Sequence, residues 1–103
     1  MSTFWQKLPK PFLALAPMED VTDTVFRQIV VKCGKPDVML TEFVNVDGMY
    51  SPGQEKVRQR LIFTEVERPL VAQLWGLASD NFYKAAKELV SMGFDGIDLN
   101  FGC

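Results

Sequence analysis

Four short runs of mainly apolar residues punctuate the chain, and amphipathic segments separate them. The runs cover residues 12–16, 38–43, 70–75 and 96–100. Runs of this length between Pro and Gly are typical of buried strands in a parallel sheet. No hairpin dipeptide such as Asn-Gly joins any two of them, so we predict parallel strands with right-handed crossover connections.

Residues 24–33 form the first of three predicted helices. Thr22 or Asp23 can cap its first turn, and Gly34 is expected to end it in the left-handed conformation. Cys33 is expected in the core, because it belongs to a regular apolar stripe. That stripe consists of Val25, Phe26, Ile29, Val30 and Cys33.

A second, shorter helix is predicted to begin at Ser51 and Pro52, which offer an N-cap and a first-turn proline, and to reach about Leu61. Its charged residues are expected to be solvated. These residues are Glu55, Lys56, Arg58 and Arg60. The last three form, with Arg68, the only basic cluster, for which a solvated surface is a better interpretation than a phosphate contact.

The third helix is predicted over residues 81–92, with Ser79 or Asp80 as its N-cap and Gly93 as its end. Its buried face is expected to consist of Phe82, Ala85, Ala86, Leu89 and Val90.

These elements give the order β-α-β-α-β-α-β, which predicts an α/β fold with a parallel sheet. It is either a small open sheet or the first half of a TIM (β/α)8 barrel, because 103 residues are far fewer than the roughly 250 of a closed barrel. Residues 1–11 are expected to be a leader, with Phe4 and Trp5 packing against the body.

The composition excludes several kinds of catalytic and metal site. The chain has no histidine, which excludes Ser-His-Asp and Cys-His catalysis, and its 2 cysteines do not have zinc-ligand spacing, so no metal site is predicted. The net charge of −2 creates no general attraction for nucleic acid or membranes. The apolar run 12–16 is too short for a membrane span, and we expect a cytoplasmic protein.

Candidate chemistry lies after the carboxyl ends of the predicted strands, where parallel α/β folds bind ligands. This places residues 16–19, 41–45, 73–76 and 100–103 on one rim. Gln73 is notable there, since a buried amide is costly unless its donors and acceptors are paired.

Four rim motifs carry a resemblance. They are Leu15–Glu19, Thr41–Phe43, Gln73–Gly76 and Asp98–Cys103. In this order and spacing they resemble the amino-terminal half of a tRNA-dihydrouridine synthase, over essentially the whole chain. The resemblance implies an FMN-binding (βα)8 barrel followed by a helical domain. It also implies NADPH-dependent reduction of the C5–C6 double bond of uridine in tRNA.

The resemblance also implies roles for the reacting residues. Reduced flavin delivers hydride to C6 of the uracil, and Cys103 protonates C5, which suits a thiol because its ordinary pKa is about 8.5. Asn100 matches the asparagine that lies against the target uracil. Asn45 stands where the family places a tRNA contact, although some members have arginine there. An inert thiol at Cys103 and a turn-capping Asn100 are the structural alternatives.

For the cofactor, the resemblance places Pro17, Met18 and Glu19 beside the isoalloxazine ring and Gln73 at the flavin pyrimidine. The structural alternatives are an ordinary turn and an amide satisfied by neighbouring backbone. Glu42 and Asp98 are interpreted as supporting rim groups. Trp5 and Trp75 are expected to be packing residues.

The chain ends at Cys103, soon after a strand, so we expect a fragment: residues 1–103 as an incomplete barrel domain with no second domain. Such a fragment is expected to be inactive and to self-associate through exposed strand edges. Two alternatives remain open. One is another FMN barrel acting on a free pyrimidine, as dihydroorotate dehydrogenase does. The other is a non-enzymatic α/β binding module.

Overall fold

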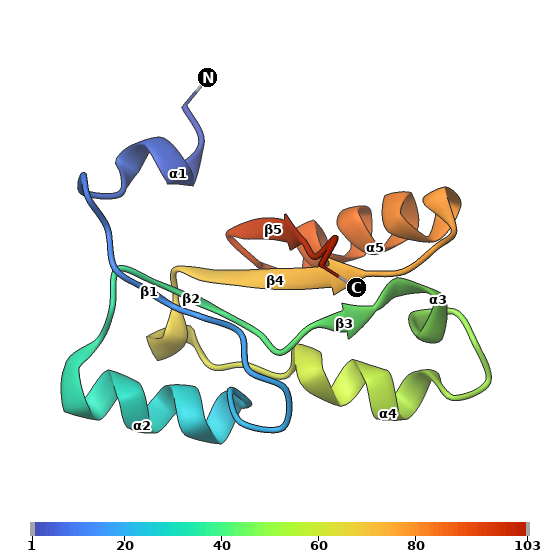
Figure 1. Cartoon of the computed structure of the whole chain (residues 1–103), viewed down its shortest axis with the longest axis horizontal. Coiled ribbons are helices and arrows are strands. Elements are labelled where there is room, and N and C mark those ends of the chain that lie inside the picture. The colour runs from blue at the N-terminus through green and yellow to red at the C-terminus, as the bar shows by residue number, and fades with distance from the viewer. Residues whose placement is uncertain (1, 103) are drawn as a thin grey trace.

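The computed structural model, which describes residues 2–102, contains one wholly parallel sheet (Figure 1). β1 pairs with β2, β2 and β3 pair with the beginning and end of one edge of β4, and β5 pairs with the other edge. The fold class predicted from the sequence is therefore confirmed. The strands are β1 (Ala14–Leu15), β2 (Val38–Leu40), β3 (Val44–Asn45), β4 (Leu70–Trp75) and β5 (Gly96–Leu99).

The three predicted helices are present, and short helical turns add to them. The predicted ones are α2 (Thr24–Gly34), α4 (Gln54–Arg58) with its 3-10 extension η1 (Gln59–Leu61), and α5 (Ser79–Met92). The additional ones are α1 (Phe4–Lys7), α3 (Val46–Met49) and the 3-10 turn η2 (Glu65–Glu67). None of the helices within residues 2–102 has the length and apolar character that crossing a membrane requires.

Alternate residues of β4 face two different environments. Leu70, Ala72 and Leu74 belong to the main core, together with Ala85 and Leu89 of α5. On the other face, Val71 packs in a second cluster with Val38 and Leu8, which Phe4, Trp5 and Phe12 cover. The leader therefore packs against the body as predicted, and Trp5 is a packing residue.

The second predicted strand, residues 38–43, is interrupted at Thr41. The backbone N–H of Thr41 still donates to the carbonyl oxygen of Val71 at 3.0 Å. The N–H of Gln73, however, donates to the Thr41 side-chain oxygen at 3.2 Å instead of a backbone carbonyl. This hydroxyl replaces one ladder acceptor, and regular pairing resumes at Val44 opposite Leu74.

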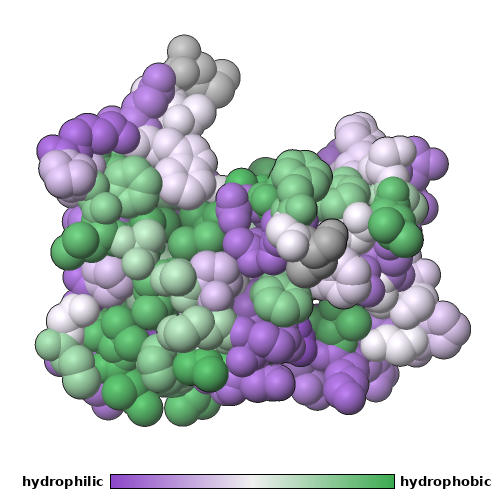
Figure 2. All heavy atoms as spheres, in the orientation of Figure 1, coloured by the Kyte–Doolittle hydropathy of each residue, from purple (hydrophilic) through white to green (hydrophobic). Residues whose placement is uncertain are grey.

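Helix α2 corrects several expectations. Asp23 is its N-cap and accepts a hydrogen bond from the Phe26 N–H at 2.9 Å, but Gly34 lies within the helix and is not left-handed. Val25 and Ile29 are 61% and 55% exposed, and Cys33 is exposed as well. The prediction that Cys33 lies in the core is therefore wrong, and of the predicted stripe Val30 packs against the main core while Phe26 is half-buried. Periodicity identifies an apolar face but not what covers it, and Figure 2 shows a large apolar area over α2.

The other helices begin differently from the prediction. The residue before α4 is Gly53, and the Ser51 hydroxyl instead donates to the Gly48 carbonyl oxygen at 2.8 Å. Neither Ser79 nor Asp80 caps α5, which begins at Ser79 itself. Gly93 does end α5 in the left-handed conformation, with φ of 95°.

Two positions are more exposed than predicted. Val90 on α5 is 71% exposed, because it lies outside the face that Ala85 and Leu89 bury. Leu13, in the first apolar run, is 73% exposed. That run forms only the short strand β1, in which Ala14 is exposed and Leu15 is half-buried, so it is not buried on both faces.

Candidate functional site

The ends of β4 and β5 bring an amide-rich group of side chains together. Gln73 is 8% exposed, and its Nε2 donates to Asp98 Oδ2 at 2.6 Å. Asn100 Nδ2 lies 3.4 Å from Gln73 Oε1 and donates to it. The Gln73 amide is therefore held by side chains, not by neighbouring backbone, and Asp98 supports it as the sequence analysis expected.

Asn100 also makes the turn contact that was its structural alternative. Its Oδ1 accepts a hydrogen bond from the Gly102 N–H at 2.8 Å. This contact uses the carbonyl side of the amide and directs Nδ2 toward Gln73. Cys103, the predicted proton donor, lies outside the described residues.

The loop after β1 is clamped around Met18. The Met18 N–H donates to the Thr22 hydroxyl at 3.0 Å, and the same hydroxyl donates to the Met18 carbonyl oxygen at 3.2 Å. The Met18 side chain is 41% exposed, and Pro17 is half-buried. The N–H of Asp20, which has φ of 60°, donates to Glu42 Oε2 at 2.7 Å. Glu42 therefore ties this loop to the loop after β2.

Arg60 also links the loop after β1 to the loop after β2. It forms an ion pair with Glu19, and its Nη1 donates to the Phe43 carbonyl oxygen at 2.9 Å. The hydrogen bond that Arg60 donates to Glu19 raises the pKa of Arg60, so the guanidinium stays charged. The expectation that Arg60 is solvated is wrong, because a long side chain with five donors reaches acceptors that the sequence does not place near it.

The other arginines of the predicted basic cluster are also paired, whereas its lysine is not. Arg58 forms an ion pair with Glu88, and Arg68 with Asp95 at 2.7 Å, so these two side chains are not simply solvated either. The Arg58 hydrogen bond lowers the pKa of Glu88. Within residues 2–102, Lys56 is exposed and has no carboxylate within ion-pairing distance.

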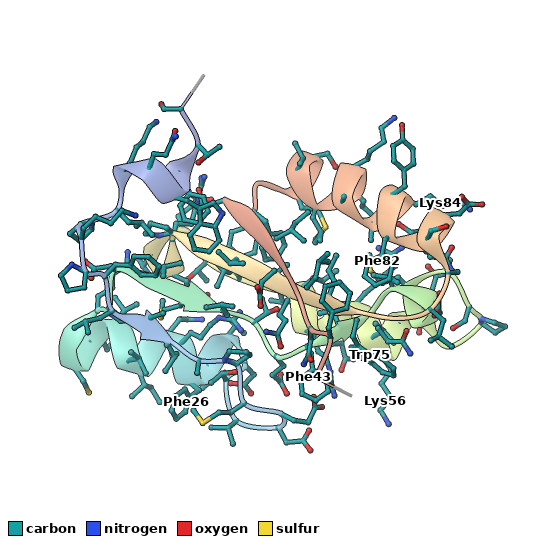
Figure 3. The ribbon with its side chains drawn as sticks, turned by 45° about the horizontal axis from the view of Figure 1, so that its top comes forward. Phe26, Phe43, Lys56, Trp75, Phe82 and Lys84 are labelled. Atoms are coloured by element: carbon teal, nitrogen blue, oxygen red, sulfur yellow. The ribbon has the colours of Figure 1, made fainter. Side chains whose placement is uncertain are left out.

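Lys56 borders a cleft of about 300 Å³ at the rim. Figure 3 shows Phe43, Lys56 and Trp75 gathered near the ends of the strands, with Lys84 on the outer side of α5. The Asn45 side chain accepts a hydrogen bond from the Asp47 N–H at 3.0 Å and so caps α3, which leaves its amide N–H groups for other partners. The lining comprises Glu19, Phe43, Asn45, Lys56, Val57, Arg60 and Trp75.

Asp47, which no sequence pattern singled out, fixes the loop after β4. Its carboxylate accepts hydrogen bonds from the N–H of Leu77 at 2.8 Å and from Asn81 Nδ2 at 2.9 Å. These bonds, with a third from the Ala78 N–H, lower the pKa of Asp47. Asp47 thus caps α5 from a separate element, and no local pattern around residues 79–81 could have revealed it.

A buried ion pair below the rim was also missed. Arg27 Nε donates to Glu67 Oε1 at 2.6 Å, and the two side chains are 1% and 0% exposed. Arg27 also donates to the carbonyl oxygens of Thr22 at 2.7 Å and Ile62 at 3.0 Å. The pair therefore joins α2 to the segment that precedes β4 and supports the clamp around Met18.

Parallel strands whose carboxyl ends gather polar side chains define an α/β protein, a class of fold in which ligands bind at that end of the sheet. Comparison with known proteins names the family. Residues 14–103 match the family model described as Dihydrouridine synthase (Dus), and the chain belongs to this family. The parallel α/β sheet is compatible with the amino-terminal half of its barrel.

Curated relatives agree with this assignment. The chain is 52% identical over 101 residues to "Probable tRNA-dihydrouridine synthase 2" of Bacillus subtilis (strain 168). It is also 52% identical to a "Probable tRNA-dihydrouridine synthase" of Staphylococcus aureus (strain COL) and 50% identical to one of Staphylococcus epidermidis. Each alignment covers 97% of this chain and 31% of the relative, so the chain spans about a third of the length of these relatives.

Proposed function

We propose that residues 1–103 form the amino-terminal half of an FMN-binding barrel and that the protein reduces uridine in tRNA to dihydrouridine with electrons from NADPH. Family membership supports the reaction class. The observation that carries the proposal is the meeting of Gln73 and Asn100 at the rim, at 3.4 Å. We expect the enzyme to act on tRNA in the cytoplasm.

The rim suits a flavin by the chemistry of its donors and acceptors. Gln73 uses one N–H on Asp98 and one acceptor position on Asn100, which leaves one donor and one acceptor for the edge of a pyrimidine ring. Pro17, Met18 and Glu19 would lie beside the ring through their backbone, because the Glu19 carboxylate is occupied by Arg60. When bound, FMN supplies the hydride that C6 of the uracil receives.

Asn100, Cys103 and Asn45 contact the substrate in this proposal. Asn100 retains an N–H of its own that can hold the uracil. Cys103 gives the thiol proton to C5 and regains a proton from water, so the double bond gains one hydride and one proton while NADPH becomes NADP⁺. Asn45 contacts the tRNA from the cleft that it shares with Lys56.

The test uses the full-length protein, purified and inspected for flavin absorbance, and then incubated with unmodified tRNA and NADPH. Mass spectrometry of nucleosides measures dihydrouridine. Cys103→Ala is expected to lower the rate by about 10²–10⁴-fold, the contribution of a general acid. Cys33→Ala is the matched control and is expected to retain activity, because Cys33 is exposed on α2, in an element apart from the rim. Undiminished dihydrouridine formation by Cys103→Ala would refute the acid role, and a colourless, inactive wild-type protein would refute the proposal.

We further propose that residues 1–103 alone are inactive, because the remaining flavin contacts come from later strands of the barrel. Within the described residues β1 and β5 each pair on one side only. Their open edges favour self-association of this segment.

A further inference from the structure

The side chains of Asp98, Gln73 and Asn100 form a hydrogen-bonded chain whose direction is fixed at both ends. At one end the Asp98 carboxylate can only accept, so Gln73 must turn Nε2 toward it, at 2.6 Å. At the other end the Gly102 N–H can only donate, so Asn100 must turn Oδ1 toward it, at 2.8 Å. Asn100 Nδ2 is then left to face Gln73 Oε1.

We propose that Asp98 is a positioning residue that sets which way the Gln73 amide faces, and through it the donor and acceptor pattern that the rim offers to the flavin. The flavin part of this inference rests on the proposed function. The amide orientation does not, because it follows from the hydrogen bonds alone.

The pairing of β4 with β5 holds Asp98 where it can orient the Gln73 amide. Gln73 and Asp98 are direct partners in the register of β4 and β5, so their Cα atoms are held opposite one another. Gln73 is 8% exposed, so a reversed amide would press its carbonyl oxygen against the carboxylate with little water to separate them. The reversed amide would also exchange the donor and the acceptor left for a ligand.

Replacing the carboxylate by an amide removes the constraint at almost constant shape. In Asp98→Asn the new side chain can either donate or accept, so this end of the chain no longer selects an orientation of Gln73, and only the 3.4 Å contact with Asn100 Nδ2 still does. Asp98→Glu keeps an acceptor-only group and is the conservative variant. Asp80→Asn is the charge-matched control, because Asp80 is exposed at the start of α5 and its side chain makes no hydrogen bond or ion pair with residues 2–102.

The first measurement is the side-chain amide NMR spectrum of the full-length, FMN-free protein, with the Gln73 signals assigned by their loss in Gln73→Met. We expect one Gln73 Nε2 proton to be shifted downfield by the carboxylate in the wild type and in Asp80→Asn. We expect the shift to be lost in Asp98→Asn and largely restored in Asp98→Glu. An unshifted Gln73 signal in the wild type would overturn the proposal without any variant.

The second measurement is the FMN dissociation constant. Asp98→Asn is expected to raise it by up to about twofold, the limit that is reached when both orientations of Gln73 are equally populated. In the Gln73→Met background the same substitution should have no further effect, because Asp98 acts through Gln73. An equal loss in both backgrounds would overturn the positioning role. If the wild-type protein binds no FMN, the proposed function fails, while the NMR result still decides how Gln73 is oriented.

Discussion

The ion pair between Arg27 and Glu67 is the contact whose loss we expect to destabilise the fold most. Glu67 accepts from Arg27 through one oxygen. Its other oxygen accepts from the Thr24 hydroxyl at 2.7 Å and from the Thr64 N–H at 2.6 Å. In Glu67→Gln one of these oxygens becomes an NH2 group. Whichever way it turns, it meets either the Arg27 Nε–H or the Thr64 N–H, and two donors then face one another.

The magnitude follows from burial. Both partners are almost fully buried, so water cannot replace the lost acceptor, and Arg27 is left as a buried charge without a counter-charge. Breaking such a pair costs about 3–5 kcal/mol. That is a large share of the roughly 5–15 kcal/mol that stabilises a typical domain.

Urea unfolding of the full-length protein measures this change as a shift of the midpoint. Glu65→Gln is the matched control, because Glu65 lies in the same 3-10 turn but is 81% exposed in its pair with Arg68. We expect that control to lose less than about 1 kcal/mol. Equal losses for Glu67→Gln and Glu65→Gln would refute the reasoning that burial sets the cost.

Two other predictions concern the rim. The hydrogen bonds from Asn81 and Leu77 lower the pKa of Asp47 below its ordinary 3.8, so the folded state binds fewer protons than the unfolded chain in acid. The stability from Asp47 is therefore complete above the ordinary pKa and lost as the pH falls through the lowered one. Thermal unfolding between about pH 7 and about pH 3 should show a shallower acid loss in Asp47→Asn, and identical profiles would contradict this. Lys56→Ala should weaken tRNA binding and reduce the slope of log affinity against log salt by about 1. Lys84→Ala on α5 is the control, and a slope unchanged in Lys56→Ala would exclude a phosphate contact.

The order and direction of the strands could be predicted from the sequence because they depend on local signals. The apolar run 70–75 and the left-handed Gly93 both define element ends within a few residues, and the structure confirms both. The meeting of Gln73 and Asn100 followed from a general rule about the carboxyl ends of parallel strands.

What could not be predicted depends on residues far apart in the chain. Asp47 caps α5 from a distance of 30 residues to Leu77, and Arg27 meets Glu67 across 40 residues. A helix pattern records that Val25 and Ile29 are apolar but not whether anything packs on them. Arg60 was misjudged for the same reason, since its partner Glu19 is 41 residues away.

The contact of the leader with β5 has a practical consequence for anyone who clones this gene. A methyl group added at Gly96 would lie 2.5 Å from the Phe4 ring, so that ring rests directly on the backbone at the start of β5. An affinity tag that disturbs the first residues, or a translation start chosen downstream of Trp5, would remove two of the three aromatic rings that cover Val38 and Val71. A poor yield of soluble protein from such a shortened chain would then reflect a damaged core, although no residue of the rim had been altered.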